Sequence, residues 1–215
     1  APLPEGWSAD LTMVDDGSQP QAAAIARDCA QEHLPGGRVR LIVHPRNRGK
    51  GAALMTGFDA VLARAAPQDA MLVQDADLEY DPADYAALLS QLAADGRTAV
   101  FGNRWADRAG RPTAVRRAHA GANRMLTAAS NLMTGLQVHD MECCYKLLPI
   151  PLLRTIRPAL TEERFGIEPQ LAAALARAGA RLAEVPVRYA PRSFAEGKKI
   201  RGKDGVRALW VILRE

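Results

Sequence analysis

The sequence predicts one α/β domain in which helices flank a mainly parallel β-sheet. Short apolar runs that resemble strands alternate with longer alanine-rich segments that have helical spacing. Strand–helix alternation of this kind is typical of a parallel sheet covered by helices. The chain has 215 residues, of which 48% are hydrophobic and 24% charged, which suits a domain with a full hydrophobic core.

The first half of the chain contains most of the expected alternation. Strands are expected at 10–14, 39–43, 70–73 and 98–101, and helices at 21–32, 51–65 and 82–94. Pro82 suits the first turn of the last of these helices.

The second half of the chain is less regular. Its expected elements are helices at 114–134, 168–178 and 206–213, and a strand at 182–189 that a basic loop follows.

Charge and cysteine content limit the functional classes. The net charge of +4 is too small to indicate a nucleic-acid partner. Three cysteines, two of them adjacent at Cys143 and Cys144, match neither a disulfide framework nor a zinc spacing, which favours a reducing cytosol. No apolar run is long enough to span a bilayer and no signal peptide opens the chain, so we expect a cytoplasmic protein.

Acidic residues follow the expected third strand. Asp75, Asp77 and Glu79 alternate in the segment QDADLEYD, so an extended backbone would direct them to one side. Carboxylates held together favour a hard divalent cation such as Mg²⁺ or Mn²⁺, which we expect here. The alternative is a solvated turn, and for Asp81 we prefer the role of helix N-cap.

Two further polar segments lie at strand ends or helix starts. Asp15 and Asp16 end the first expected strand in DDGS, which is also good turn chemistry. Lys50 lies in RNRGKG at the start of a helix, where free backbone N–H groups and an ammonium suit an anion. Since carboxyl ends of parallel strands meet at one edge, DDGS, QDAD and GNR (102–104) should converge there.

The ordered motifs resemble family 2 glycosyltransferases of the GT-A fold. The later blocks resemble the branch of dolichyl-phosphate mannosyltransferases and polyprenyl-phosphate glucosyltransferases. The matching blocks are VDDGS (14–18), NRGKGAA (47–53), QDADLEYDP (74–82), FGNR (101–104), DMECCYK (140–146), RFGIEP (164–169), EVPVRY (184–189) and EGKKI (196–200).

This resemblance implies roles for individual residues. Asp15 and Asp16 would contact the nucleotide, and Asp75 and Asp77 would hold the metal with help from Glu79. On the acceptor side, Arg104 with Arg116 or Arg117 would receive the phosphate, and the residues expected to take part in catalysis are Asp77, Arg104 and Arg117. The residues expected near the donor diphosphate are Lys50, Arg192, Lys198 and Lys199.

The resemblance also implies an organisation and one departure from it. We expect a single domain over 1–215, with residues 1–110 binding the nucleotide sugar and 111–215 binding the acceptor. The family's first strand, with its Pro-x-Tyr-Asn-Glu-like stretch, has no counterpart here. The sheet should therefore lack one strand, which affects recognition of the nucleotide base.

The expected reaction is a metal-dependent, inverting transfer of a hexosyl group from a GDP-mannose or UDP-glucose type of donor to polyprenyl or dolichyl phosphate. An ionised phosphate needs no general base. Transfer to a sugar hydroxyl would need one, and Asp140 or Glu142 is the candidate. A non-catalytic nucleotide-sugar-binding fragment is the third possibility. A lipid acceptor implies peripheral contact with the inner face of a membrane, through the basic segment 104–124.

Overall fold

The computed structural model describes residues 3–33, 39–106, 114–192 and 202–215. Most of the strands and helices that the sequence predicts in these ranges are present. The strands are β1 (Leu11–Asp15), β2 (Val39–Val43), β3 (Ala70–Leu72), β4 (Thr98–Asn103), β5 (Lys146–Pro149) and β6 (Arg181–Pro186); the helices are α1 (Pro20–His33), α2 (Lys50–Leu62), α3 (Tyr85–Ser90), α4 (Ala114–Thr134), α5 (Ile150–Ile156), α6 (Ile167–Arg177) and α7 (Gly202–Arg214).

The strands form two sheets, and the larger one is mixed. β1 pairs with β2 in parallel, whereas the other sheet has the order β3-β5-β4-β6. β5 runs antiparallel to both β3 and β4, and β4 runs parallel to β6. The expected α/β fold is present, but the strands form two sheets rather than one, and the larger sheet is mixed rather than mainly parallel. The unpredicted strand β5 reverses the direction at the centre, and no ladder joins β1 to β3 in the described part of the chain.

Two other differences between the predicted and the observed elements have local causes. β5 is only four residues long and includes a buried lysine, so neither its length nor its pattern identified it as a central strand. The helix expected at 82–94 is a 3₁₀ turn, Pro82–Asp84, followed by α3, which ends at Ser90. Asp81 caps this turn as predicted, because its side chain accepts a hydrogen bond from the N–H of Ala83 at 2.9 Å.

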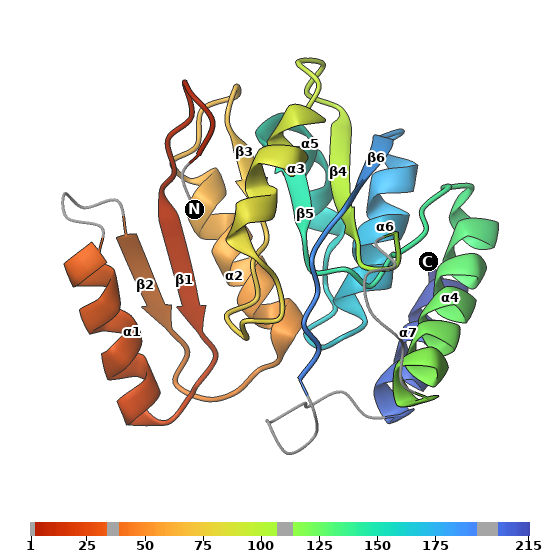
Figure 1. Cartoon of the computed structure of the whole chain (residues 1–215), viewed down its shortest axis with the longest axis horizontal. Coiled ribbons are helices and arrows are strands. Elements are labelled where there is room, and N and C mark those ends of the chain that lie inside the picture. The colour runs from red at the N-terminus through yellow and green to blue at the C-terminus, as the bar shows by residue number, and fades with distance from the viewer. Residues whose placement is uncertain (1–2, 34–38, 107–113, 193–201) are drawn as a thin grey trace.

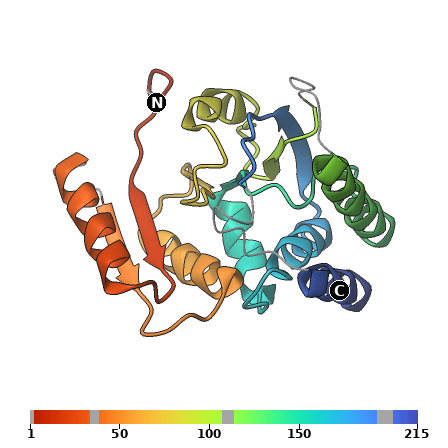
Figure 2. The same ribbon diagram turned by 60° about the horizontal axis from the view of Figure 1, so that its bottom comes forward.

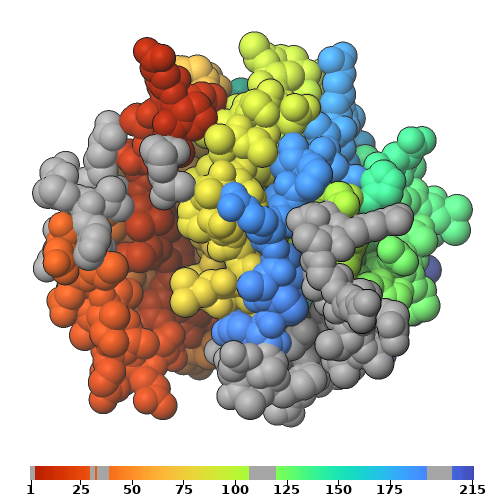
Figure 3. All heavy atoms as spheres, viewed as in Figure 1, coloured from red at the N-terminus to blue at the C-terminus, as the bar shows by residue number. Residues whose placement is uncertain are grey.

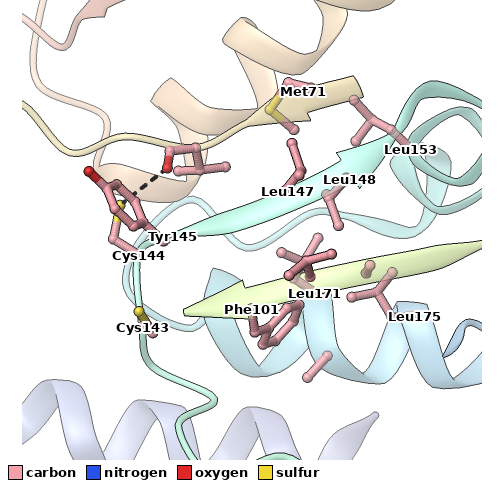
Figure 4. Packing of buried hydrophobic residues seen from close by; sticks show 14 of the residues in the cluster. Met71, Phe101, Cys143, Cys144, Tyr145, Leu147, Leu148, Leu153, Leu171 and Leu175 are labelled. Atoms are coloured by element: carbon pink, nitrogen blue, oxygen red, sulfur yellow. Dashed lines mark hydrogen bonds between the residues drawn. The ribbon is translucent and has the colours of Figure 1, made fainter. Parts of the chain in front are cut away.

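Helices cover both faces of the larger sheet. α3 lies on one face, and α2, α5 and α6 lie on the other (Figures 1 and 2). The core fills the space between β4, β5 and α6, where Phe101, Leu147 and Leu171 are buried (Figure 4). This core fixes the positions at which the strands end, and the polar motifs lie at those ends.

Candidate active site

Asp16 organises the turn that leads into α2. Its Oδ1 lies 2.7 Å from Nδ1 of His44 and accepts the N–H of Arg48 at 2.9 Å, while its Oδ2 accepts the N–H of Gly49 at 2.7 Å. Burial alone would raise the pKa of Asp16, but these contacts outweigh burial and lower it. Asp16 therefore links the end of β1 to the start of α2, and both of its oxygens are already occupied.

Asp15 has one oxygen free. Its Oδ1 accepts the N–H of Ser18 at 2.9 Å, and its Oδ2 is buried without a hydrogen-bond partner in the described part of the chain. A buried acceptor without a donor is costly unless a ligand supplies one. Of the DDGS pair, Asp15 is therefore the one that can accept from a bound molecule.

The glycines of NRGKG serve close packing. A Cβ on Gly51 would lie 1.9 Å from the carbonyl oxygen of Glu162, and Gly49 has a φ of +112°. The N–H of Ala52 also donates to the carbonyl of Glu163 at 2.9 Å. The segment before α6 thus covers the N-terminus of α2, and the expected anion site there is reduced to the side chain of Lys50.

Lys50 joins α2 to the acidic loop, which we define as residues 73–81. Its Nζ lies 2.9 Å from Oδ2 of Asp75 and 2.8 Å from Oε1 of Glu168. Burial would lower the pKa of Lys50, but Glu168 and Asp75 raise it well above its usual value. For Asp75, burial would raise the pKa, and the charge of Lys50 lowers it. The pair is therefore ionised. The DDGS and QDAD motifs, which were predicted to converge, are linked through the start of α2.

Arg192 binds two further carboxylates of the acidic loop, those of Asp77 and Glu79. Its Nη2 lies 3.0 Å from Oδ2 of Asp77, and its backbone N–H and Nε reach Oε1 of Glu79 at 3.0 and 3.3 Å. Burial, together with the charges of Asp75 and Glu79, raises the pKa of Asp77. In Figure 3 the surface of the acidic loop lies beside the surface of the segment that ends at Arg192, on one face of the molecule.

The side chains of the acidic loop are chemically suited to bind a divalent cation. Carboxylate oxygens are the ligands that Mg²⁺ and Mn²⁺ prefer. Burial is the main cause of the raised pKa of Asp77, and the charges of Asp75 and Glu79 add to it; a cation would relieve that repulsion. No group of three or more His, Cys, Asp or Glu residues within the described ranges is already arranged as a metal site. Lys50 and Arg192 instead hold the oxygens that a cation would use.

Arg104, at the end of β4, is bound internally. Its Nε and Nη2 donate to Asp140 at 2.8 and 2.7 Å, and Asn123 accepts from Nη2 at 3.3 Å. Asp140 is fully buried. Burial alone would raise the pKa of Asp140, but the hydrogen bonds and the charge of Arg104 outweigh burial and lower this pKa below its ordinary value. An ionised carboxylate locked in this way is a poor proton acceptor, so Asp140 does not suit the role of general base that the sequence left open.

A cleft of about 480 Å³ lies beside the acidic loop. Its walls are the residues 78–82 and 187–190, and Arg104 forms part of its lining. The guanidinium of Arg104 lies 5.1 Å from the ring centroid of Tyr189, which places a positive charge against this wall. Arg104 therefore forms part of the wall of the cleft, although its guanidinium donates hydrogen bonds to Asp140 and Asn123.

Glu142 is a titratable group that sequence reasoning named only as one of two alternatives. Burial and the charge of Glu168 raise its pKa to about 7, despite opposing effects of Lys146 and Arg104. Its Oε1 is buried without a partner among the described residues. The sequence signal was present in DMECCYK, but only the packing distinguishes Glu142 from Asp140.

Several predicted residues lie outside what the structure describes. These are the side chains of Arg116 and Arg117 and the residues Lys198 and Lys199. Cys143 and Cys144 are buried in the core, and Sγ of Cys144 accepts the N–H of Asp75 at 3.1 Å. Within the described ranges, no helix combines the length and the apolar character needed to cross a membrane.

Two solved structures share the fold of this chain. Glucosyl-3-phosphoglycerate synthase from Mycobacterium tuberculosis, in complex with phosphoglyceric acid, matches with a TM-score of 0.58 and 18% identity, over 95% of this chain and 68% of that one. The same enzyme in complex with Mn²⁺, UDP-glucose and phosphoglyceric acid matches with a TM-score of 0.57 and 16% identity, over 97% and 79%. The fold is therefore that of GT-A enzymes.

The chain belongs to glycosyl transferase family 2, whose family model matches residues 10–157. The undecaprenyl-phosphate 4-deoxy-4-formamido-L-arabinose transferase of Edwardsiella ictaluri is 31% identical over 90% of this chain and 54% of its own length. The enzyme of the same name from Pseudomonas fluorescens is 30% identical over 88% of this chain and 50% of its own length. The chain thus spans about half the length of these relatives.

Proposed function

We propose that this glycosyltransferase moves a sugar from a nucleoside diphosphate donor to polyprenyl phosphate, with inversion at the anomeric carbon. The observation that carries the proposal is the acidic loop, in which Lys50 and Arg192 neutralise carboxylates at the point where the motifs of β1, α2 and β3 meet. Oxygen ligands beside basic side chains suit a metal–diphosphate group. The relatives named for undecaprenyl phosphate support the lipid acceptor.

The residues on the donor side have different proposed roles. Asp75 and Asp77 would hold Mg²⁺ or Mn²⁺, with Glu79 beside them, and Asp15 would accept a hydrogen bond from the nucleoside. When bound, the cation neutralises the charge on the leaving diphosphate. With the cation on the carboxylates, Lys50 and Arg192 would be released from Asp75 and Asp77 and would bind oxygens of the diphosphate. Each basic side chain would then have a diphosphate oxygen as its partner in place of a carboxylate.

On the acceptor side, the chain would position an ionised phosphate. A phosphate oxygen attacks the anomeric carbon without a general base, so the contribution of the protein is orientation and charge stabilisation. The cleft beside Arg104 lies against the acidic loop and is the place we assign to the acceptor phosphate. On the basis of the family motifs, Arg116 or Arg117 in α4 remains a proposed contributor on the acceptor side, and Lys198 and Lys199 remain proposed contributors near the donor diphosphate.

The proposal is tested by transfer of label from sugar nucleotides to undecaprenyl phosphate in the presence and absence of Mn²⁺. The donor panel contains UDP-glucose, GDP-mannose and UDP-4-deoxy-4-formamido-L-arabinose, because the relatives are named for a pentose derivative rather than for a hexose. We expect metal-dependent formation of a lipid-linked sugar from one donor. Hydrolysis of the donor without transfer to any phosphate acceptor would contradict the lipid acceptor.

A second candidate is transfer to a sugar hydroxyl, with Glu142 as the general base. It is favoured by one observation, the pKa of Glu142 of about 7, which suits proton abstraction near neutral pH. Glu142→Gln separates the two reactions. Transfer to a phosphate should survive this change, whereas transfer to a hydroxyl should fall by roughly 10²–10⁴-fold.

A further inference from the structure

Glu168, in the first turn of α6, is buried between two lysines. Its Oε1 lies 2.8 Å from Nζ of Lys50, and its Oε2 accepts a hydrogen bond from Nζ of Lys146 on β5. Lys50 also contacts Asp75 of the acidic loop. Glu168 is therefore one residue removed from the carboxylates to which the cation was assigned.

Four side chains form a row of alternating charge that runs from the interior to the acidic loop. In order they are Lys146, Glu168, Lys50 and Asp75. The exposed fraction of the side chain rises along this row, from 1% and 5% for the first two to 19% and 29% for the last two. A ligand in the acidic loop can therefore reach Asp75 and Lys50, while Glu168 and Lys146 lie behind them.

Lys146 fixes the orientation of the Glu168 carboxylate. Nζ of Lys146 also donates to the carbonyl of Cys143 and lies 5.0 Å from the ring centroid of Phe101. These contacts hold the ammonium of Lys146 in the core. Because Oε2 of Glu168 is bound to this fixed group, its Oε1 is held toward Lys50.

The pairing of Glu168 with Lys50 is not needed to join their helices. The N–H of Ala52 donates to the carbonyl of Glu163 at 2.9 Å, and Arg48 pairs with the side chain of Glu163 at 2.7 Å. These contacts already hold the segment before α6 against the start of α2. A buried ion pair contributes little net stability, because removing both charges from water is costly. A role in the site therefore explains this pair better than a role in the fold.

Lys50 can keep one carboxylate while it loses the other. An ammonium has three N–H donors, and the ion-pair partners of Lys50 among the described residues are Asp75 and Glu168. If a cation takes the oxygens of Asp75, Glu168 still holds Lys50, and two N–H groups become available to phosphate oxygens. Without Glu168 the same exchange would leave a largely buried ammonium with no fixed partner, which is strongly unfavourable.

We infer that Glu168 is a positioning residue for the donor diphosphate. By sharing Lys50 with Asp75, it weakens the hold of Lys50 on Asp75 and keeps the ammonium in place when a cation binds. The ligands are the divalent cation and nucleoside diphosphate of the proposed function, on which this inference rests. Glu168 itself touches neither of them and acts through Lys50.

The test is calorimetric titration of Mn²⁺ into the nucleotide-free protein, and then of UDP and GDP at saturating Mn²⁺. In Glu168→Gln, Asp75 is the one remaining carboxylate on Lys50, so Mn²⁺ should bind roughly tenfold more weakly. The nucleoside diphosphate that the wild type binds should also bind a few-fold more weakly, because Lys50 is no longer held in place. Loss of a negative charge would by itself tighten the binding of an anion, so the second result distinguishes positioning from a simple field effect.

Lys146→Met is the matched control. It breaks the same buried pair from the other side and leaves Glu168 on Lys50, so it should lower stability but change both affinities by less than about twofold. If Glu168→Gln alone does not fold, Lys146→Met combined with Glu168→Gln removes both buried charges and is compared with Lys146→Met. In a Lys50→Met background, Glu168→Gln should change the affinity for the nucleoside diphosphate by less than about twofold, because Glu168 acts through Lys50.

The outcomes separate the role of Glu168 from the proposed function. Circular dichroism establishes that each variant folds. Unchanged or tighter nucleotide binding in folded Glu168→Gln would overturn the inference, as would an equal loss in the Lys50→Met background. An equal loss in Lys146→Met would assign Glu168 to the fold. A wild type that binds neither Mn²⁺ nor nucleotide would overturn the inference and the proposed donor site together. The expected binding results without sugar transfer to polyprenyl phosphate would count against the proposed function alone.

Discussion

Two arginine–aspartate pairs on the same edge of the fold differ in how easily their charges can separate. Arg192 and Asp77 meet at 3.0 Å at the surface, where Arg192 is 35% exposed, and Arg104 and Asp140 meet at 2.7 Å in the interior. A partly exposed pair can separate at little cost, because water and ions replace the partner. A buried pair cannot, because either charge left alone is strongly unfavourable. The first pair can therefore exchange partners with a ligand, as the proposed function requires, whereas the second pair is part of the framework.

The largest effect is expected from breaking the buried pair. Asp140→Asn leaves the charge of Arg104 buried without its counter-ion, and the free energy of unfolding should fall by about 3–5 kcal/mol in denaturant titration. The matched control is Asp59→Asn. Asp59 makes the same two-bond contact with Arg157, at 2.7 Å for each bond, but is largely exposed, so its loss should cost under about 1 kcal/mol. Equal losses in the two variants would contradict the distinction.

The exchangeable pair should affect catalysis rather than stability. Asp77→Asn should lower transfer by roughly 10²–10³-fold and change the free energy of unfolding by under about 0.5 kcal/mol. Calorimetry should also show that donor binding no longer depends on Mn²⁺. Asp69→Asn, at the opposite end of β3, is the control and should keep both properties. Retained Mn²⁺-dependent donor binding in Asp77→Asn would exclude this residue as a ligand.

Glu142 differs from both pairs, since its carboxyl group is buried without an ion-pair partner among the residues that the structure describes. Its pKa is raised to about 7 from an ordinary 4.5, so the folded state keeps a proton that the unfolded state loses between these values. Stability should therefore fall as pH rises through this window, by up to about 3 kcal/mol, and then level off. Glu142→Gln should remove this fall in thermal or denaturant unfolding. An unchanged pH profile would show that Glu142 ionises normally.

The sequence predicted the strand ends better than the sheet between them. DDGS, QDAD and GNR could be assigned to one edge because carboxyl ends of strands meet there. The contacts of Asp16 with Gly49 and of Lys50 with Asp75 link DDGS to QDAD, and Arg104 of GNR lines the same cleft as residues 78–82. β5 could not be foreseen, because its four residues have no alternation and its direction depends on contacts distant in sequence. Local pattern determines where a strand ends, whereas the order of strands depends on the whole chain.

The same limit applies to the partners of the charged residues. The roles of Asp75, Asp77 and Arg192 were proposed from motifs. The pairing of Asp75 with Lys50 and of Asp77 with Arg192 depends on loop geometry that the sequence does not contain. Asp140 and Glu142 differ by two positions in DMECCYK and were equivalent candidates for a base. Only the burial of Asp140 against Arg104 separates them, because an ion pair lowers one pKa while desolvation raises the other.

The smallest expected effect comes from removing the exchangeable arginine. In Arg192→Gln the carboxylates of Asp77 and Glu79 lose their counter-ion, so Mn²⁺ should bind the nucleotide-free protein a few-fold more tightly, in line with roughly 0.2–1 kcal/mol for such a pair. The diphosphate loses a basic contact in the same variant, so donor affinity in saturating Mn²⁺ should fall. Arg181→Gln is the control, because its exposed contact with Asp95 at 3.3 Å is far from the acidic loop in sequence and belongs to the start of β6. If Arg192→Gln instead weakened Mn²⁺ and donor together and lowered the melting temperature, Arg192 would belong to the framework, as Arg104 does.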